Sequence, residues 1–376
     1  MDERREEHMT ASRLVKTVMG IGSTALALLF LSVFAFAAEL PEQALSHANP
    51  RVQEVMGAQE AATPDLMAMP DVLGTAVGQD DSGEVTILVY VNLEGKNPAA
   101  SARNIPRSLR GESVTVEFTE PFRALGKPAP STKVSHTAKQ TPPIQLGTCG
   151  GWRYDLANGY CCGGTLGSLV QKDGTQYILS NYHVFESDIV SGGNSKVATT
   201  GDFIIQPGLI DVSCNAANAQ NVATVVINKS LLNSNVDASI GQVVPGMVQT
   251  DGAILEIGTI SSQTVGASIN QLVKKSGRTT GLSRSKVSGL NATVSVAYDN
   301  ECAGGEAFTK TFTGQIIISN RASKFLAGGD SGSLMVEDVA TNPRAVGLLF
   351  AGSSTLAVAN PIAEVLSFFG ATMVGQ

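Results

Sequence analysis

Gly329-Asp330-Ser331-Gly332-Ser333 stands late in the chain, within residues 149–376. A serine hydroxyl is a good nucleophile only when a base takes its proton and other groups stabilise the oxyanion. Glycines beside the serine allow a tight turn, in which amide N–H groups can point at the developing charge. Because Gly-Asp-Ser clusters also form ordinary turns, the motif needs support from residues elsewhere.

Residues 149–376 contain many short strand-like runs separated by turn residues. Examples are YILSNYHV (177–184), NVATVVI (221–227) and FTGQIIIS (312–319). Frequent short strands indicate a β-barrel or sandwich. The run PIAEVLSFFG (361–370) has proline at its start and glycine at its end, which is typical of a helix. We therefore expect an all-β domain with a C-terminal helix.

The composition excludes several classes of protein. The chain has 376 residues, 43% of them hydrophobic and 16% charged, and its net charge is −7. These values argue against a disordered chain or a long coiled coil. A nucleic-acid-binding protein normally has a strong basic excess, so no nucleic-acid partner is expected. CxxC, HExxH and Walker A motifs are absent from the sequence, and neither a metal nor a cofactor is expected.

The N-terminal residues predict export. Val18–Ala38 is an uncharged run that follows basic residues and includes the small-x-small pattern Ala35-Phe36-Ala37. This pattern predicts a signal peptide over residues 1–37 that is cleaved before Ala38. The alternative is an uncleaved anchor, since a run of this length can span a bilayer. We expect a secreted or periplasmic protein, with membrane contact only if the segment is uncleaved.

The cysteines suit an oxidising compartment, where disulfides persist. All of them lie in the C-terminal region: Cys149, Cys161, Cys162, Cys214 and Cys302. Their odd number leaves at least one thiol without an intrachain partner. Spacing does not determine connectivity, and our best guess pairs Cys149 with Cys161 or Cys162, and Cys214 with Cys302.

Residues 38–120 are predicted to form a small α+β module. A helix is expected over 49–62, capped by Asn49 and stopped by Pro64. A second short helix is expected at Pro106–Leu109. The strand-like runs are Val72–Gly78, Val85–Val91 and Ser113–Thr119. The module contains no group of residues that could form a catalytic site. It is interpreted either as a pro-region or accessory module, or as a plain packing subdomain.

Residues 121–148 are interpreted as a linker rich in proline and lysine. Such a composition favours an exposed segment that proteases can nick.

Two further residues could support Ser331. His183 is the only histidine in 149–376 and lies at the end of an apolar strand-like run, where a general base or a core histidine would both be reasonable. Asp237 stands among Val236, Ala238 and Ile240, where an unpaired carboxylate would be costly to bury, although it could also be a surface residue on a strand edge. The order His…Asp…Ser differs from that of α/β-hydrolases and of subtilisin-like enzymes.

With these motifs, residues 149–376 resemble trypsin-like serine endopeptidases of the chymotrypsin fold (PA clan). GDSGS, NYHV and VDASI match the family's serine, histidine and aspartate segments, and KSGRTTGLSRSKV (275–287) is similar to a hairpin of divergent bacterial members. The resemblance implies a double β-barrel of two six-stranded barrels, with His183 and Asp237 on the first and Ser331 on the second. It implies that Ser331 attacks the substrate, His183 transfers the proton and Asp237 orients His183.

The resemblance also implies the remaining site residues. The oxyanion hole would be the N–H groups of Gly329 and Ser331. Phe350, Ala351 and Gly352 occupy the places of the family's Ser-Trp-Gly substrate strand. Phe325 stands where a trypsin carries Asp, so no preference for Lys or Arg is expected. The family's Ile-Val-Gly-Gly terminus is absent from the sequence, which argues against activation of Asp330 by a new N-terminus.

The expected function is that of an exported serine endopeptidase that acts on protein or peptide substrates through an acyl-enzyme. Two alternatives remain open: a catalytically silent peptide-binding module on a protease fold, and an esterase with the same triad.

Overall fold

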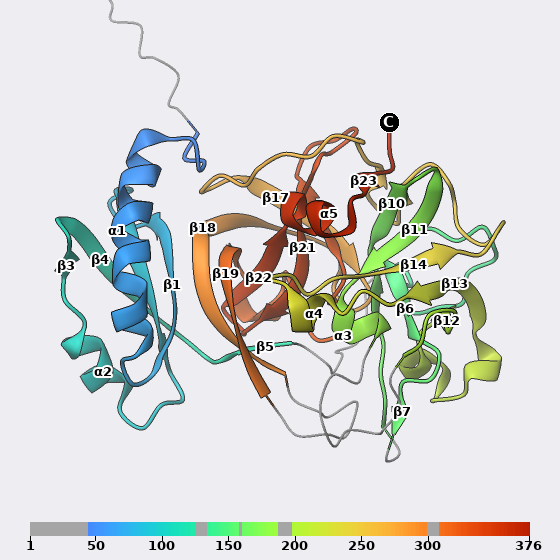
Figure 1. The fold of residues 1–376 in the computed structure, drawn as a ribbon, viewed down its shortest axis with the longest axis horizontal. Coiled ribbons are helices and arrows are strands. Elements are labelled where there is room, and N and C mark those ends of the chain that lie inside the picture. The colour runs from blue at the N-terminus through green and yellow to red at the C-terminus, as the bar shows by residue number, and fades with distance from the viewer. Residues whose placement is uncertain (1–43, 125–133, 158–159, 187–197, 299–307) are drawn as a thin grey trace, which may run out of the picture. The chain divides into compact units, whose positions relative to one another are not determined.

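The computed structural model describes residues 44–124, 134–157, 160–186, 198–298 and 308–376. The predicted signal peptide lies outside these ranges. Gln43–Gln376 form one compact unit, in which most elements are strands of two large sheets (Figure 1). The predicted all-β fold with a C-terminal helix is confirmed. Within the described ranges, no helix is long and apolar enough to cross a membrane.

One sheet closes into a barrel. Its six strands, orange and red in Figure 1, follow the order β17 (Leu272–Gly277), β20 (Leu334–Glu337), β21 (Ala345–Gly352), β22 (Leu356–Pro361), β19 (Phe308–Ser319) and β18 (Gly281–Tyr298). β17 also pairs with β18 from Leu272↔Lys286 to Gly277↔Gly281, which completes the ring. We call it the C-terminal barrel. It carries Ser331 in the turn before β20.

The other large sheet has eight strands, and we call it the first barrel. Its order is β23 (Thr372–Met373), β10 (Ser168–Lys172), β11 (Thr175–Ser180), β14 (Ser239–Val243), β13 (Gln220–Val226), β12 (Phe203–Gln206), β6 (Thr148–Trp152) and β9 (Gly164–Leu166). In the described residues this order runs from β23 to β9 without closing. The sheet has eight strands where the resemblance implied six, and the N–H of Gly167, directly after β9, donates to Leu179 O of β11 at 2.9 Å, which links β9 back to β11.

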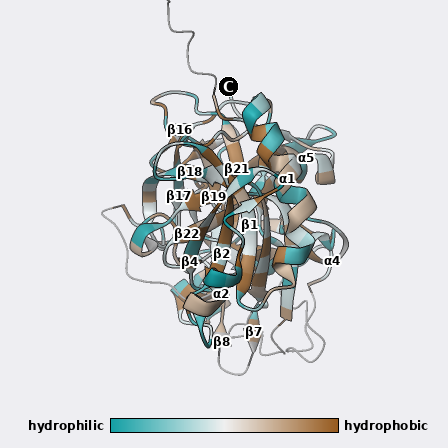
Figure 2. Ribbon diagram, turned by 90° about the vertical axis from the view of Figure 1, so that its left-hand side faces the viewer, coloured by the Kyte–Doolittle hydropathy of each residue, from teal (hydrophilic) through white to brown (hydrophobic). Residues whose placement is uncertain are grey.

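The N-terminal strands extend the sheet of the C-terminal barrel. They are β1 (Val72–Gln79), β2 (Val85–Asn92), β4 (Glu112–Thr119) and β3 (Ser108–Leu109). β1 pairs antiparallel with β18 through Gly74↔Val294, so the two parts of the chain share one eleven-stranded sheet. The three predicted strands are present. Figure 2 shows that hydrophobic residues are concentrated along the central strands, which fits their burial.

Helix α1 (Pro50–Met67) begins where it was predicted, with Asn49 Oδ1 accepting from the N–H groups of Arg51 and Val52. The prediction that Pro64 ends it is wrong, because the helix continues to Met67. Its buried residues, including Leu66, pack in the same cluster as β1 and β2, and this packing outweighs the lost backbone bond.

The short helix of this region lies earlier than predicted. α2 spans Pro98–Asn104 and is capped by the Asn97 side chain. The helix predicted at Pro106–Leu109 is absent, because Ser108–Leu109 form β3 against the start of β4. Pairing with a neighbouring strand therefore replaces the local helical preference.

The prediction of an exposed linker fits only some positions of its described part, residues 134–148: Lys139 and Pro143 are exposed, but other side chains are buried. Ile144, Leu146 and His136 are fully or almost fully buried. The N–H of Ile144 donates to Met247 O at 2.8 Å, and Leu146 forms a bridge to Ile254 in β15 (Ala253–Ile254), which pairs with β16 (Gly258–Thr259). The two apolar side chains join the core of the barrels in spite of the prolines around them.

The C-terminal helix α5 (Ile362–Phe369) confirms the prediction. Gly370 ends it in the left-handed conformation, with φ of 62°. Val365 and Phe369 pack in one core cluster with Leu348 of β21. The helix therefore covers the C-terminal barrel and has a packing role.

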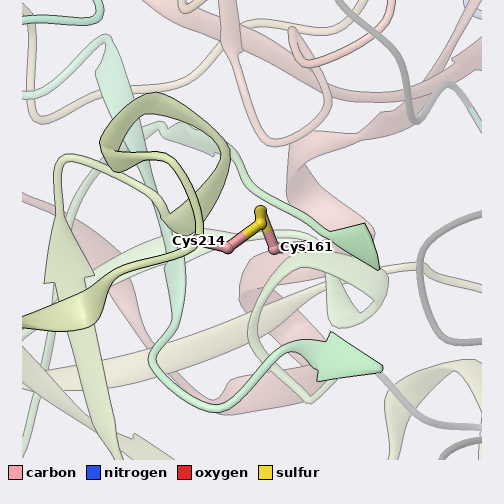
Figure 3. The surroundings of a disulfide bond; sticks show 2 residues. All are labelled: Cys161 and Cys214. Atoms are coloured by element: carbon pink, nitrogen blue, oxygen red, sulfur yellow. A yellow bond between two sulfur atoms is a disulfide. The ribbon is translucent and has the colours of Figure 1, made fainter. Parts of the chain in front are cut away.

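The disulfide guess is wrong. Cys161, at the end of β8 (Tyr160–Cys161, which pairs with β7, Leu156–Ala157), bonds to Cys214 after the 3-10 helix η1 (Leu209–Val212), as Figure 3 shows. Cys149 is a free thiol, and it is completely buried in β6. Burial raises the pKa of this thiol to about 12. Cys162 is also disulfide-bonded, and Cys302 lies outside the described residues.

Candidate active site

His183 and Asp237 lie side by side. His183 is in the short helix α3 (Tyr182–Phe185) directly after β11, and Asp237 precedes β14, the strand that pairs with β11. The Asn181 side chain joins the two segments by donating from Nδ2 to Asp237 O at 2.7 Å. The result is a hydrogen bond of 2.6 Å between His183 Nδ1 and Asp237 Oδ2.

The Asp237 carboxylate is fully buried, and both of its oxygens are satisfied. Oδ1 accepts from the N–H of Tyr182 at 2.8 Å and of His183 at 3.4 Å. Oδ2 accepts from His183 Nδ1 and, at 2.9 Å, from the Tyr298 hydroxyl. Donors on every side make burial of the charge tolerable. They also require the proton of neutral His183 to lie on Nδ1, which leaves Nε2 as an acceptor.

His183 Nε2 is buried and has no hydrogen-bond partner among the described residues. A buried nitrogen without a partner is costly, and such atoms deserve a functional explanation. Here the available lone pair is the one that a general base needs.

Ser331 comes from the other barrel and meets the same region through β9. Its carbonyl accepts from the N–H of Thr165 at 2.8 Å. A Cβ placed on Gly164 would lie 3.0 Å from Ser331 O and 2.6 Å from Val184 Cγ2, next to His183. The serine turn and helix α3 therefore pack against the same glycine. Ser331 and His183 are not hydrogen-bonded to each other in this structure.

The backbone around Ser331 turns at two glycines with positive φ, Gly329 and Gly332. Gly329 has φ of 92°, a conformation that favours glycine. The carbonyls of Gly328 and Gly329 accept from Thr279 Oγ1 at 2.5 Å and Thr165 Oγ1 at 2.9 Å. The N–H groups of Gly329 and Ser331 donate to no residue in the described ranges, so both could bind a developing oxyanion.

Asp330 has a counter-charge inside the protein. Lys275 Nζ lies 3.1 Å from Asp330 Oδ1, and both side chains are fully buried. The same carboxylate accepts from Thr279 N at 2.8 Å, Thr280 Oγ1 at 2.8 Å and Ala327 N at 3.0 Å. Burial lowers the pKa of Lys275, and the neighbouring Asp330 opposes this shift. These contacts fix the loop before Ser331 without a newly formed N-terminus.

A segment of the chain's own N-terminal part lies along β21. This is β5 (Phe122–Arg123), which pairs parallel with β18 and antiparallel with β21 through Arg123↔Gly352. Phe122 is fully buried in an aromatic cluster that includes Tyr182 and Tyr298. In the predicted substrate segment, β5 therefore occupies the edge of β21 at Gly352.

The structure buries the predicted substrate-binding residues. Phe350 and Ala351 belong to the same hydrophobic cluster as Phe122 of β5. Phe325 is 2% exposed and packs in the large core shared with the N-terminal strands. The side chain closest to Gly352 is that of Leu326, whose Cδ2 would lie 3.1 Å from a Cβ placed there. Sequence reasoning missed Leu326.

Sequence reasoning also missed Tyr298 and Lys275 as partners of the two site carboxylates. One signal for Lys275 was present: two adjacent lysines in the strand-like run NQLVKKSG, where a buried lysine needs an acidic partner. For Tyr298 no local pattern existed. No cluster of metal-ligating side chains occurs in the part of the chain that the structure describes.

Comparison with known proteins finds similar solved structures, several of which are serine proteases. No protein-family model and no curated protein sequence matches the chain. It is similar to Thermobifida fusca protease A, with 20% identity and a TM-score of 0.41 over 62% of this chain and 99% of that one. It is similar to a Cellulomonas bogoriensis chymotrypsin, with 18% identity and a TM-score of 0.38 over 62% and 99%. It is also similar to a glutamic-acid-specific serine protease, with 17% identity and a TM-score of 0.41 over 61% of this chain and 100% of that one.

Proposed function

We propose that this protein is an exported serine endopeptidase in which Ser331 attacks the peptide carbonyl. The observation that carries the proposal is the 2.6 Å hydrogen bond from His183 Nδ1 to the buried Asp237. It leaves Nε2 free of partners among the described residues, next to the serine turn. His183 takes the proton of Ser331 and returns it to the leaving amine, and Asp237 stabilises the imidazolium. Gly329 and Ser331 N–H groups stabilise the oxyanion.

Substrates are peptides that bind as an added strand along β21. Main-chain hydrogen bonds give such binding without regard to sequence, and side-chain pockets add selectivity. Phe325 stands where a trypsin carries Asp, so no preference for Lys or Arg before the cleaved bond is expected.

The N-terminal module masks the cleft until the linker is cut. This part of the proposal is supported by β5, which occupies the position of a substrate strand on β21. Export is supported by the disulfide between Cys161 and Cys214, since disulfides persist in oxidising compartments.

The test compares the unsubstituted protein with Ser331→Ala and His183→Ala on matched peptide amide and ester substrates. Each substitution should lower kcat by several powers of ten, and their effects should not add, because the residues act as one unit. Hydrolysis that survives Ser331→Ala would exclude the mechanism. Cleavage of esters alone would favour the esterase, and tight peptide binding without cleavage would favour a silent binding module.

A further inference from the structure

Tyr298 is the one side chain of the C-terminal barrel that donates a hydrogen bond to Asp237 among the described residues. Its hydroxyl lies 2.9 Å from Oδ2, the oxygen that also accepts from His183 Nδ1. The other donors to this carboxylate come from α3, and two of them are main-chain groups. The main chain of Asp237 is also held by that barrel, since its N–H donates to Asn360 Oδ1 of β22 at 2.9 Å, but the carboxylate is linked to the barrel through the phenol.

Packing fixes this phenol in place. The Tyr298 ring stacks on Phe308 with centroids 4.9 Å apart and also contacts Phe312. It meets the His183 ring edge-on at 6.0 Å. Burial and the nearby Asp237 raise the pKa of the phenol well above its ordinary value, so the hydroxyl keeps its proton and can only donate to the carboxylate.

Tyr298 also lies at the end of β18, the strand onto which the N-terminal module is added. Four residues earlier, Val294 pairs with Gly74 of β1, and Val296 pairs with Phe122 of β5. The pairing of β1 and β5 with this end of β18 therefore also helps to position the Tyr298 hydroxyl that donates to Asp237.

We propose that Tyr298 is a positioning residue for the reaction, which sets the orientation and basicity of His183 through Asp237. The inference rests on the proposed function. Because the phenol and the imidazole share Oδ2, the Tyr298 hydrogen bond takes part of the negative charge that would otherwise act on His183. The same hydrogen bond also fixes the orientation of the Asp237 carboxylate towards the His183 ring, as a catalytic triad requires.

The charged surroundings of Asp237 are otherwise sparse in the described residues. Lys310 of β19 and Glu186 at the end of α3 act on it through space. Lys310 Nζ is held by the carbonyls of Leu231 and Ser234, in and just after helix α4 (Ser230–Asn233). Neither side chain is hydrogen-bonded to the Asp237 carboxylate. Among the described residues, Tyr298 is therefore the only side chain besides His183 that donates a hydrogen bond to this carboxylate, and a substitution can remove it.

The test is Tyr298→Phe in the full chain, which removes the hydroxyl and keeps the stacked ring. We expect kcat/KM for a peptide substrate to fall about tenfold, mostly in kcat, which is the effect of losing a hydrogen bond to a charged group. The acidic limb of the pH–rate profile should move to higher pH, because the undivided charge of Asp237 stabilises the imidazolium. A merely structural role would leave this limb where it is.

Tyr90→Phe is the matched control. The Tyr90 hydroxyl is buried in the same aromatic cluster and has no hydrogen-bond partner in the described residues. This variant should keep the unsubstituted rate and pH profile. A Tyr298→Phe protein with the profile of Tyr90→Phe, and with kcat within twofold of the unsubstituted enzyme, would overturn the proposal.

A second measurement does not depend on turnover. In the Ser331→Ala protein, the proton NMR resonance of His183 Nδ1–H should move downfield on Tyr298→Phe, since the remaining hydrogen bond to Oδ2 strengthens. An unmoved resonance would overturn the inference. Lack of hydrolysis by the unsubstituted protein would instead count against the proposed function and leave this NMR result to decide the role of Tyr298.

Discussion

Lys275 and Asp330 form the most completely buried ion pair in the described part of the chain. Removing one member of such a pair leaves an uncompensated charge, which typically costs about 3–5 kcal/mol. Asp330 lies next to Ser331, and its carboxylate accepts from Ala327 and Thr279. The ion pair therefore connects the stability of the protein to the shape of the serine turn.

Lys275→Met should lower the free energy of unfolding by about that amount and abolish reaction of Ser331 with a fluorophosphonate. Urea unfolding and labelling measure the two effects. Lys274→Met is the control, because Lys274 Nζ donates to the Val339 carbonyl and has no buried carboxylate partner. Equal effects of both substitutions would contradict this role of Lys275.

Glu186 predicts a dependence of stability on pH. It is 1% exposed, and burial raises the pKa of its carboxyl, although bonds from Ser239 and two N–H groups oppose the shift. A raised pKa in the folded state favours the protonated form. The stabilisation is complete below the ordinary value of 4.5 and is lost as the pH rises through the folded-state pKa.

Glu186→Gln should remove this dependence. Relative to the variant, the unsubstituted protein should lose unfolding free energy as the pH increases from 4.5 towards neutrality. Urea unfolding at several pH values measures the difference. If the difference between the two proteins stays constant over this range, Glu186 does not titrate as the structure indicates.

The candidate residues Ser331, His183 and Asp237 could be named from the sequence because each sits in a recognisable local context. Their catalytic role stays a prediction. Tyr298 could not be named, because it stands far along the chain from Asp237 and looks like any aromatic at the end of a strand. The disulfide guess failed for the same reason: residues near in sequence, such as Cys149 and Cys161, need not be near in space.

At the scale of elements, β5 is the part of the structure with the most direct consequence. It has only two residues, yet Phe122 is completely buried with its ring edge-on to Tyr90 at 5.8 Å, and Arg123 pairs with Gly352. Such a short strand depends on its side chain for binding, because it makes few main-chain bonds. The Phe122 side chain is thus the main attachment of β5.

Phe122→Ala should open the cleft. Loss of a buried phenylalanine costs about 3–5 kcal/mol, which is enough to displace a two-residue strand. The rate of fluorophosphonate reaction of the full chain should rise severalfold. Phe118→Ala is the control, since Phe118 lies on β4 with 45% of its surface exposed. If Phe122→Ala lowers stability but leaves the labelling rate unchanged, β5 does not mask the site.

Strands were predictable from the alternation and turn signals, but boundaries that depend on packing were not. Pro64 looked like the end of α1, yet the buried Leu66 extends the helix beyond it. Ile144 and Leu146 lie in a Pro-rich segment that favours exposure, and the barrel core nevertheless takes them in. In each case burial of apolar side chains outweighs a local preference.

At the scale of the whole molecule, the described N-terminal part and the C-terminal barrel share a sheet and a hydrophobic core. Val55 of α1, Val89 of β2 and Ile318 of β19 belong to one buried cluster. No local pattern in the sequence predicts that β1 pairs with β18, because sheet pairing between distant segments has no signature in either one. The predicted module boundary at residue 120 therefore stays a proposal.

Expression of Val134–Gln376, which keeps the buried Ile144 and Leu146, tests the dependence of the barrels on the module. Without β1, one edge of β18 is unpaired and part of the shared core is exposed to water. The fragment should have a lower Tm than the full chain and fold more slowly. A fragment with the Tm and folding rate of the full chain would show that the barrels do not need the module.

The identity of the nucleophile is the claim on which the account depends. The direct measurement is mass spectrometry of peptides from protein treated with a fluorophosphonate, for the full chain and for the chain nicked between residues 124 and 134. We predict one adduct, on Ser331, which forms faster after nicking and disappears in His183→Ala. An intact Ser331 in both forms, or an adduct on another serine, would contradict the proposed mechanism.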